Sequence, residues 1–282
     1  MNIGVSGSSG QLGQATVREL QARNQGHKLV AISRTPLSAE GLEGRLGDYD
    51  RLETLVEAYA GLDKLVLIPS ADLRPGVRGT QNETAIAAAV AAGVKHIVLI
   101  SATRTREQAE PAMVASFWRG EQALIKSAPR WTILRMNYFA EALAIEAKQS
   151  VASGVLTGLA ENKVAFVARD DVAAAAAGIV LTEDHSGAIY SATGPKSFTG
   201  QERAALISEI LDTKIGFVVI PVEALRTGMT RMGLPESVIN AVVDIQTDFA
   251  AGAYDIVTGD VERLAGRPPK PLAEALTAAL KG

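Results

Sequence analysis

The sequence predicts an α/β fold with a doubly wound parallel sheet and a smaller, mostly helical C-terminal lobe. In the first half, short β-branched runs alternate with helical stretches rich in Ala, Leu and Glu. Strands that alternate with helices in this way are typical of βαβ units, which build parallel sheets. The runs are also apolar on both faces, as expected for strands that helices cover on both sides of a sheet.

The expected elements follow one another along the chain. The strands of the first half are "NIGVSG", "HKLVAISR", "DKLVLIPS", "KHIVLISA" and "WTILRM", and the helices cover 11–23, 50–60, 80–92 and 118–128. Further on, "VARDDVAAAAAGIVLTE" predicts a strand end, an Asp cap and a helix, and "GAIYSATG" predicts one more strand. In "TGQERAALISEILDTK", the spacing of Thr199 and Glu202 predicts a helix that begins with a capping box. The remainder after "KIGFVVIP" is mostly helical in pattern.

Composition excludes several classes of function. The net charge of -3 gives no electrostatic basis for binding nucleic acid or an anionic membrane. No apolar run reaches the ~18 residues that suggest a membrane span. The absence of cysteine excludes disulfides, thiolate catalysis and Cys-ligated zinc. The three histidines are far apart, so no metal site is expected. We therefore expect a soluble, cytoplasmic protein.

The stretch "GVSGSSGQLGQATV", residues 4–17, carries the clearest chemical signal. Gly7, Gly10 and Gly13 are spaced G-x-x-G-x-x-G between an apolar strand and a helix. A glycine turn that leads into a helix N-terminus offers free N–H groups and a positive dipole to a phosphate. Gly7 and Gly10 would face the pyrophosphate of a dinucleotide, and Gly13 would let the helix pack closely on the strand. The alternative is a glycine turn with a purely structural role. The expected cofactor contacts here are Gly7, Ser8, Ser9, Gly10, Gln11 and Leu12.

The end of the second strand predicts which dinucleotide is bound. A Rossmann protein that prefers NAD usually has an acidic residue at this point, but "AISRTP" has Ser33 and Arg34. Arg34 could pair with a 2′-phosphate, so NADP(H) is predicted in preference to NAD(H). The alternative is that Arg34 is an ordinary solvated charge.

Other strand ends predict further cofactor contacts, because ligands of such sheets bind at the carboxyl ends of the strands. In "GDYD", Asp48 and Tyr49 are expected to meet the adenine, unless this segment is only a turn. Pro69 and Ser70 end the strand "DKLVLIPS", below the adenosine ribose and pyrophosphate. Ser101 ends the strand "KHIVLISA", near the nicotinamide.

These motifs define the expected domains. A dinucleotide-binding domain covers 1–135, and 171–194 returns to it. A substrate lobe covers 136–170 and 195–282. The two are interleaved, with the chain crossing between them more than once.

The chain resembles the NmrA-like atypical short-chain dehydrogenase/reductases, and among them the bacterial NAD(P)H quinone oxidoreductase and triphenylmethane reductase group. The resemblance covers nearly the whole length. It rests on "GSSGQLG", "GDYD", "AAGVKHIVLIS", "GEQALIKSAPRWTILRMNYFAE", "ARDDVAAAAAGIVL" and "GRPPKPLAEAL". It implies an NADPH-dependent oxidoreductase.

One departure from the pattern of short-chain dehydrogenases predicts the class of substrate. Their usual Tyr-x-x-x-Lys pair is missing. Counting back four and eight residues from Glu121 reaches Phe117 and Met113, and a register shifted by one residue reaches Trp118 and Val114. Reduction of a simple ketone makes an alkoxide, which needs an acid close by. Reduction of a quinone makes a phenolate, whose conjugate acid has a pKa of ~10, so water can complete the step. A cationic triarylmethane dye needs no proton.

The predicted function is therefore hydride transfer from NADPH to quinones or similar electron-poor conjugated acceptors, such as dyes and azo compounds. The alternative is an NADP-binding redox-sensing regulator without turnover, because a missing Tyr–Lys pair fits both functions. A ketone reductase or a sugar-nucleotide epimerase conflicts with the missing pair. The expected partner is a small conjugated aromatic substrate, and a homodimer is left open.

Aromatic residues near the expected nicotinamide site are the candidate pocket walls. Asn137, Tyr138 and Phe139 follow the strand "WTILRM" and would lie beside the nicotinamide, with Phe117 and Trp118 on the opposite side. The alternative for these side chains is core packing. The candidates for a catalytic role are Tyr138, Asn137 and Ser101, with Tyr138 considered as a proton donor.

Overall fold

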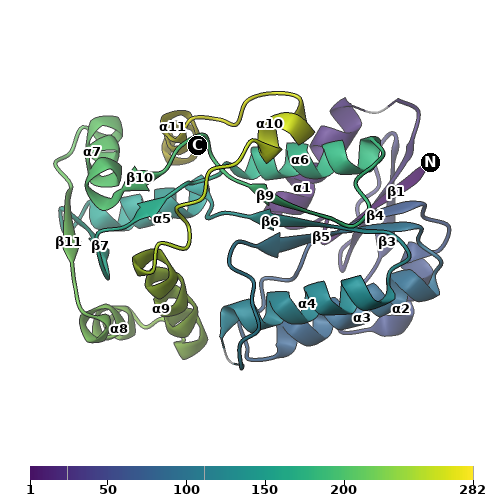
Figure 1. Cartoon of the computed structure of the whole chain (residues 1–282), viewed down its shortest axis with the longest axis horizontal. Coiled ribbons are helices and arrows are strands. Elements are labelled where there is room, and N and C mark those ends of the chain that lie inside the picture. Colours follow the sequence, from purple (N-terminus) through teal and green to yellow (C-terminus); the bar gives the residue numbers. More distant parts are fainter. Residues whose placement is uncertain (24, 111, 282) are drawn as a thin grey trace. The chain divides into compact units, whose positions relative to one another are not determined.

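A computed structural model describes residues 1–23, 25–110 and 112–281 (Figure 1). The chain forms two compact units. Unit 1 comprises Met1–Met136, Asp170–Ala192 and Asp260–Arg267. Unit 2 comprises Asn137–Arg169, Thr193–Gly259 and Pro268–Gly282, with Gly282 itself outside the described residues.

Unit 1 is built on a parallel sheet of seven strands in the order β3-β2-β1-β4-β5-β6-β9. Its strands are β1 (Asn2–Ser6), β2 (Lys28–Ser33), β3 (Leu42–Leu46), β4 (Lys64–Leu67), β5 (His96–Ala102), β6 (Trp131–Met136) and β9 (Ala188–Ala192). In register, Val5 of β1 lies opposite Ala31 on one side and Val66 on the other. The strand order reverses at β1 and β4, which is where ligands of doubly wound sheets bind. The predicted parallel sheet is confirmed.

Helices cover both faces of this sheet. They are α1 (Gln11–Ala22), α2 (Leu52–Tyr59), α3 (Val77–Ala91), α4 (Met113–Ser127), α6 (Arg169–Leu181) and α10 (Asp260–Ala265). Figure 1 shows α2, α3 and α4 on one face, and α1 and α6 on the other. This arrangement explains why the strands are apolar on both sides and why β4 and β5 are buried along their whole lengths.

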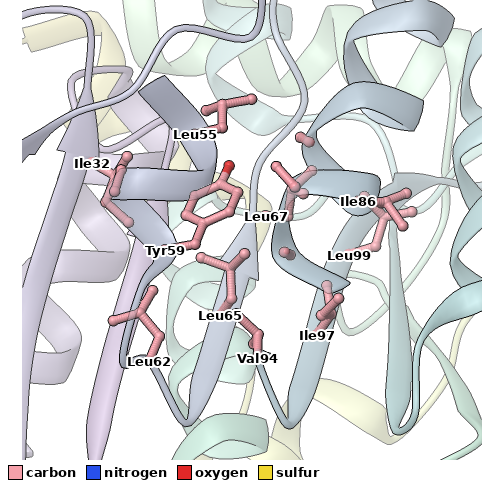
Figure 2. Close-up of a cluster of buried hydrophobic side chains, with 14 of the residues drawn as sticks. Ile32, Leu55, Tyr59, Leu62, Leu65, Leu67, Ile86, Val94, Ile97 and Leu99 are labelled. Atoms are coloured by element: carbon pink, nitrogen blue, oxygen red, sulfur yellow. The ribbon is translucent and has the colours of Figure 1, made fainter. Parts of the chain in front are cut away.

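One hydrophobic core of unit 1 lies between the sheet and the α2–α4 face (Figure 2). Leu55 and Tyr59 of α2 pack there with Leu65, Leu67, Ile97 and Leu99 of the strands and Ile86 of α3. Burying each aliphatic side chain of this size contributes roughly 1.5–3 kcal/mol. The Tyr59 hydroxyl satisfies its polar end by a hydrogen bond of 2.8 Å with Ser6 Oγ, just before the glycine turn.

Unit 2 is mostly helical, as predicted. Its elements are α5 (Ala140–Ser150), β7 (Val155–Gly158), β8 (Lys163–Val164), β10 (Phe198–Thr199), α7 (Gly200–Leu211), β11 (Gly216–Val219), α8 (Val222–Arg231), α9 (Glu236–Ala250) and α11 (Leu272–Lys281). Two-stranded sheets join β10 to β8 and β11 to β7. The capping box of Thr199 and Glu202 is present at the start of α7 and is confirmed.

Some element boundaries differ from expectation. The sequence offered no apolar run for β3, which has no fully buried residue. Helix α3 begins three residues earlier than expected, after Gly76 at φ 74°. Helix α4 begins at Met113 instead of 118. Among the described residues, no helix combines the length and low polarity that a membrane span requires.

The segment Asp260–Arg267 belongs to unit 1, although the sequence placed it in the substrate lobe. Ser191 N of β9 donates a hydrogen bond of 2.8 Å to Asp260 Oδ2, and Arg267 Nη1 contacts Asp171 Oδ1 at 2.5 Å. The backbone of α10 also touches α6, because a Cβ added to Gly178 would lie 1.9 Å from Leu264 O. These contacts between distant segments are not visible in a local sequence pattern.

Candidate functional site

The glycine turn leads from β1 directly into α1. Gly7 adopts a φ of 83°, which side chains rarely tolerate. Gly7 N and Ser8 N both donate to Ile32 O of β2, at 3.0 and 3.1 Å, and Gly10 N donates to Gly7 O at 3.1 Å. Gly10 caps α1 without a side-chain hydrogen bond, and the first turn contains no acidic residue. The helix therefore presents its first N–H groups and its positive dipole without a protein anion to neutralise them.

The three glycines serve different purposes. A Cβ added to Gly13 would lie 2.2 Å from Gly7 O, so Gly13 is needed for α1 to pack against the turn. A Cβ on Gly7 would lie 2.9 Å from Ile68 O, in addition to the strain of its positive φ. A Cβ on Gly10 would meet only Gly7 O, at 3.4 Å. Gly10 is exposed, so the protein itself does not require a glycine there, and space remains for a ligand to approach the backbone.

The other predicted residues of the turn divide into inward and outward sets. Ser9, Gly10 and Gln11 are exposed, while Ser8 and Leu12 are buried. The Ser8 hydroxyl donates to Ile32 O at 3.0 Å, so both donors of Ser8 stabilise the turn and its side chain is not free to bind a cofactor. The outer face is therefore formed by the backbone of Ser9 to Gln11 and the start of α1.

Arg34 stands directly after β2 and is exposed. It forms no hydrogen bond or ion pair within the parts of the chain that the structure describes. An exposed guanidinium at this strand end is free to pair with a phosphate. No acidic side chain occupies positions 33–36, where NAD-specific proteins carry one.

Asp48 and Tyr49 occupy the loop after β3 and support the turn. The Asp48 carboxylate accepts a hydrogen bond of 3.2 Å from Asp50 N. The Tyr49 hydroxyl donates to Ile68 O at 2.7 Å, and a Cβ on Gly7 would lie 3.3 Å from the same hydroxyl. Burial raises the pKa of Tyr49. Its hydroxyl is therefore committed to the main chain beside the glycine turn, and only its ring is available to an adenine.

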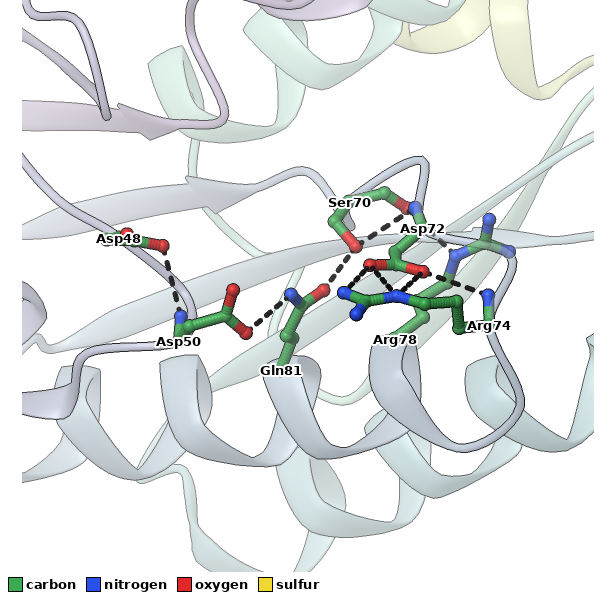
Figure 3. A network of polar contacts seen from close by, with 7 residues as sticks. All are labelled: Asp48, Asp50, Ser70, Asp72, Arg74, Arg78 and Gln81. Atoms are coloured by element: carbon green, nitrogen blue, oxygen red, sulfur yellow. Dashed lines mark hydrogen bonds and ion pairs between the residues drawn. The ribbon is translucent and has the colours of Figure 1, made fainter.

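A polar network joins two loops and helix α3 at the carboxyl edge of the sheet (Figure 3). Ser70 Oγ donates to Gln81 Oε1 of α3, and Gln81 Nε2 donates to Asp50 Oδ1 at 2.8 Å. Half-buried Ser70 thus connects the end of β4 with the loop after β3, and Pro69 is half-buried beside it. No motif in the sequence pointed to Gln81, which lies one helical turn inside α3 and is nevertheless buried. The network fixes the positions of the loops on which a ribose would rest.

Ser101 is fully buried at the end of β5 and belongs to an ionic cluster. Its hydroxyl donates to Glu121 Oε1 of α4 at 2.6 Å. Arg135 of β6 holds the same carboxylate with Nε at 2.9 Å and Nη2 at 2.6 Å. The pairing raises the pKa of Arg135. The Ser101 hydroxyl is therefore committed to Glu121 in this geometry, which favours a structural role over a catalytic one. A charged residue within the apolar run "WTILRM" was the available signal for this cluster.

The predicted pocket residues of unit 1 are Phe117 and Trp118 on α4. Phe117 is buried, and the guanidinium carbon of Arg78 lies 5.1 Å from the centroid of its ring. Trp118 is half-buried. Sequence analysis did not identify Arg78, although it lies in the first turn of α3 next to the strand end that carries Ser70.

The predicted pocket residues of unit 2 make contacts within unit 2. Asn137 is buried, donates from Nδ2 to Tyr254 O at 3.2 Å, and accepts from Tyr138 N at 2.7 Å. The Tyr138 ring packs edge-on against Phe249, with centroids 5.0 Å apart. Phe139 lies 5.7 Å from the guanidinium carbon of Arg169.

The Tyr138 hydroxyl has a half-buried partner. It donates to Glu146 Oε1 at 2.9 Å. Burial, followed by the charge of Glu146, raises the pKa of Tyr138 well above its usual value, and burial also raises the pKa of Glu146. A phenol with a raised pKa and an engaged proton is a poor acid. The geometry favours a structural role for Tyr138 over proton donation.

Across residues 1–23, 25–110 and 112–281, no three acidic, His or Cys side chains gather as a metal site would require. The carboxyl edge of the sheet carries a glycine turn and an open helix N-terminus after β1. After the neighbouring strand β2 it carries Arg34, which has no partner among the described residues. Together with the reversal of strand order at β1 and β4, these features define a dinucleotide-binding protein of the Rossmann type.

The comparisons identify the family. The chain belongs to the NAD(P)H-binding family, whose model matches residues 7–183. It is 30% identical to the NAD(P)H azoreductase of Xenophilus azovorans, over 96% of this chain and 95% of that protein. The crystal structure of the NADPH-dependent quinone oxidoreductase of Escherichia coli, complexed with NADPH, matches with a TM-score of 0.91 and 28% identity, over 98% and 99% of the two chains.

A third relative reduces dyes. The triphenylmethane reductase of Citrobacter sp., solved with NADP(H), matches with a TM-score of 0.88 and 28% identity, over 99% of this chain and 100% of that one. The resemblance drawn from the sequence motifs, and the predicted Rossmann fold, are thereby confirmed.

Proposed function

We propose that this protein is an NADPH-dependent reductase that transfers hydride to quinones or similar electron-poor conjugated acceptors, including dyes and azo compounds. The observation that carries the proposal is the open N-terminus of α1, where Gly10 leaves room for a pyrophosphate and no protein anion competes. The full-length similarity to reductases of quinones, azo compounds and triphenylmethane dyes supports the class of acceptor.

The proposed binding mode uses the chain's own backbone and charges. The start of α1 would hold the pyrophosphate, Arg34 the 2′-phosphate, and the loops joined by Ser70 and Gln81 the adenosine half. Bound NADPH would supply the hydride. The protein would orient the reactants and exclude water, which are the main contributions a protein makes to cofactor chemistry.

The lack of a positioned acid restricts the proposed acceptors. No Tyr occurs between Glu83 and Trp131, Ser101 is bound to Glu121, and Tyr138 is bound to Glu146. Acceptors whose reduced form is a weak base are therefore favoured, since water can protonate a phenolate with a pKa of ~10 in the conjugate acid.

The test is NADPH oxidation with a panel of quinones, cationic triarylmethane dyes, azo dyes and unactivated aliphatic ketones. We expect turnover with the conjugated acceptors and none with the ketones. Rapid reduction of aliphatic ketones would contradict the proposal. Tight NADPH binding without turnover of any acceptor would favour the redox-sensing regulator.

Two narrower proposals concern the setting. We propose a cytoplasmic location, which cell fractionation tests. We also propose a homodimer, which light scattering after size-exclusion chromatography tests; a mass of one chain would contradict it.

A further inference from the structure

Arg78 is an arginine that is almost completely buried and yet only partly used. It is the second residue of α3, and its side chain is 7% exposed. Nε donates to Ser70 O at 2.8 Å, and the guanidinium carbon lies over the Phe117 ring, 5.1 Å from its centroid. These two contacts hold the guanidinium just beyond the carboxyl end of β4.

The terminal nitrogens of Arg78 have no acceptor. Within the described part of the chain, Nη1 and Nη2 form no hydrogen bond or ion pair. Among the described residues, the polar side-chain atoms that are both buried from solvent and without a hydrogen-bond partner are His96 Nδ1, Thr103 Oγ1, Ser197 Oγ and Arg203 Nε. Arg78 Nη1 and Nη2 have no partner and are not among these atoms, so solvent still reaches them. Arg78 therefore keeps a forked pair of donors that solvent reaches.

Neighbouring charges do not neutralise this fork. The charge of Asp72 acts on Arg78 and opposes the lowering of its pKa, but the Asp72 carboxylate is held by Arg74 at 2.5 and 3.1 Å (Figure 3). Burial lowers the pKa of Arg78, and an arginine still remains protonated in proteins. A charge held this way is costly unless a ligand supplies an anion or a strong acceptor.

We infer that the Nη groups of Arg78 form a subsite for the acceptor oxygen that becomes negatively charged when hydride is transferred. The inference rests on the proposed function. The forked geometry of arginine suits an oxygen anion, and the bond to Ser70 O holds it just beyond the carboxyl end of β4, on the edge where ligands of such sheets bind.

The chemistry of the step balances as follows. The quinone gains a hydride from NADPH, which is oxidised to NADP⁺: an O–H bond forms at one carbonyl oxygen, the ring becomes aromatic, and the electron pair of the opposite C=O bond moves onto the other oxygen. That oxygen is a phenolate until water gives it a proton. A donor that binds the oxygen more strongly as its charge grows lowers the barrier, because its contact is strongest in the transition state.

A phosphate of the cofactor is the other oxygen anion that Arg78 could bind, and the choice of acceptor separates the two sources. Reduction of a cationic triarylmethane dye places hydride on carbon and cancels a positive charge, so no oxygen anion forms. Menadione, a neutral quinone, does form one. An arginine that serves the acceptor oxygen helps menadione alone, whereas an arginine that holds a phosphate helps both.

The experiment compares Arg78→Gln and Arg78→Lys with the parent, and Arg130→Gln is the matched control. Arg130 is a partly exposed arginine outside the proposed subsite whose charge is already paired with Glu183. We expect Arg78→Gln to lower kcat/KM for menadione about ten- to hundredfold, the effect of one hydrogen bond to a charged group. The dye activity and NADPH binding should stay within about twofold, and Arg130→Gln should resemble the parent. Arg78→Lys keeps the charge without the fork and should still lose menadione activity.

Two outcomes overturn the inference. One is unchanged menadione activity in folded Arg78→Gln and Arg78→Lys. The other is weaker NADPH binding together with equal losses for dye and menadione, which would assign the arginine to a cofactor phosphate.

If the parent reduces neither acceptor, the proposed function fails, and equilibrium binding still tests the subsite. The probe is anionic 2-hydroxy-1,4-naphthoquinone with the NADP⁺-loaded protein. The subsite predicts binding about tenfold tighter to the parent than to Arg78→Gln, and equal binding would refute it.

Discussion

Gly13 lies so close to Gly7 that a Cβ on Gly13 would sit 2.2 Å from Gly7 O, whereas a Cβ on Gly10 would touch only the same carbonyl, at 3.4 Å. This difference separates folding from binding within one turn. Gly10→Val should fold and lose NADPH binding, because its side chain fills the space that a pyrophosphate needs. Gly13→Ala should lose stability and so yield little folded protein. Thermal melting and fluorescence titration with NADPH check both variants. A folded Gly10→Val that binds NADPH like the parent would place the cofactor elsewhere.

Arg34→Ala should change the choice of cofactor. A hydrogen bond to a charged group contributes roughly 1.5–3 kcal/mol, so NADPH binding should weaken about ten- to hundredfold. NADH has no 2′-phosphate, so its binding should change little. Titration belongs at low ionic strength, since Arg34 is exposed and salt screens the contact. Equal affinity of the parent for NADPH and NADH would remove Arg34 from the site.

Glu121→Ala should destabilise unit 1 strongly. Glu121 is 1% exposed and binds both Ser101 and Arg135. Removing one partner of a buried ion pair costs about 3–5 kcal/mol, because the other charge is left without compensation. The matched control is Glu83→Ala, which removes a carboxylate that is 42% exposed and pairs with Arg119; its cost should stay below about 1 kcal/mol. Urea unfolding measures the free energy of unfolding of both variants. A similar loss in the two would contradict the expectation that the ion pair of Glu121 is a buried one.

Acid should destabilise the protein through His96. Its Nε2 donates to Thr132 Oγ1, since that hydroxyl donates in turn to His185 O, and Nδ1 is buried without a partner. Burial, followed by the charges of Arg130 and Lys64, lowers the pKa of His96 from 6.5 to about 4, against the opposing charge of Glu183. The unfolded chain therefore binds the proton first as pH falls.

The His96 contribution is thus complete above pH 6.5 and decreases as the pH falls toward 4, with a total loss of about 3 kcal/mol. Urea unfolding between these pH values measures the slope. His96→Asn cannot take up this proton, so its slope should be shallower. Equal slopes in the variant and the parent would mean that other groups cause the acid sensitivity.

Tyr138→Phe and Ser101→Ala should keep most of the quinone activity. Both hydroxyls donate to carboxylates, Tyr138 to half-buried Glu146 and Ser101 to buried Glu121. Their loss should appear instead as lower stability, by about 1–3 kcal/mol for each carboxylate left short of a donor. A fall in kcat by two orders of magnitude or more, with unchanged NADPH binding, would make the residue concerned a proton donor.

The sequence was sufficient for the architecture because periodicity and turn chemistry are local. The glycine turn, the parallel sheet and the Thr199–Glu202 capping box could each be derived from a few adjacent residues. The stacking of Arg78 on Phe117, and the capture of Ser101 by Glu121, could not. Both depend on how α3 and α4 are rotated against each other and against β5, and an apolar pattern does not specify which polar side chain on a helix face points inward.

Tyr138 illustrates the same limit at a strand end. Placing it after β6 was correct, but the direction of its ring depended on the aromatic cluster formed with Phe166 and Phe249. Phe249 lies more than a hundred residues away in the chain. A prediction based on proximity to the expected nicotinamide could not include that competition for the ring.

The composition of unit 1 from three chain segments has a consequence for synthesis on the ribosome. A nascent chain that has released only Met1–Met136 already contains six of the seven strands, but β9, which pairs with β6, lies at Ala188–Ala192. Until then β6 is an open edge, and the sheet face that α6 covers lacks its helix. Unpaired edges and uncovered apolar faces promote aggregation. The sheet of unit 1 is therefore completed only after Asn137–Arg169 of unit 2 has been made, and helix α10 of unit 1 is added only after Thr193–Gly259.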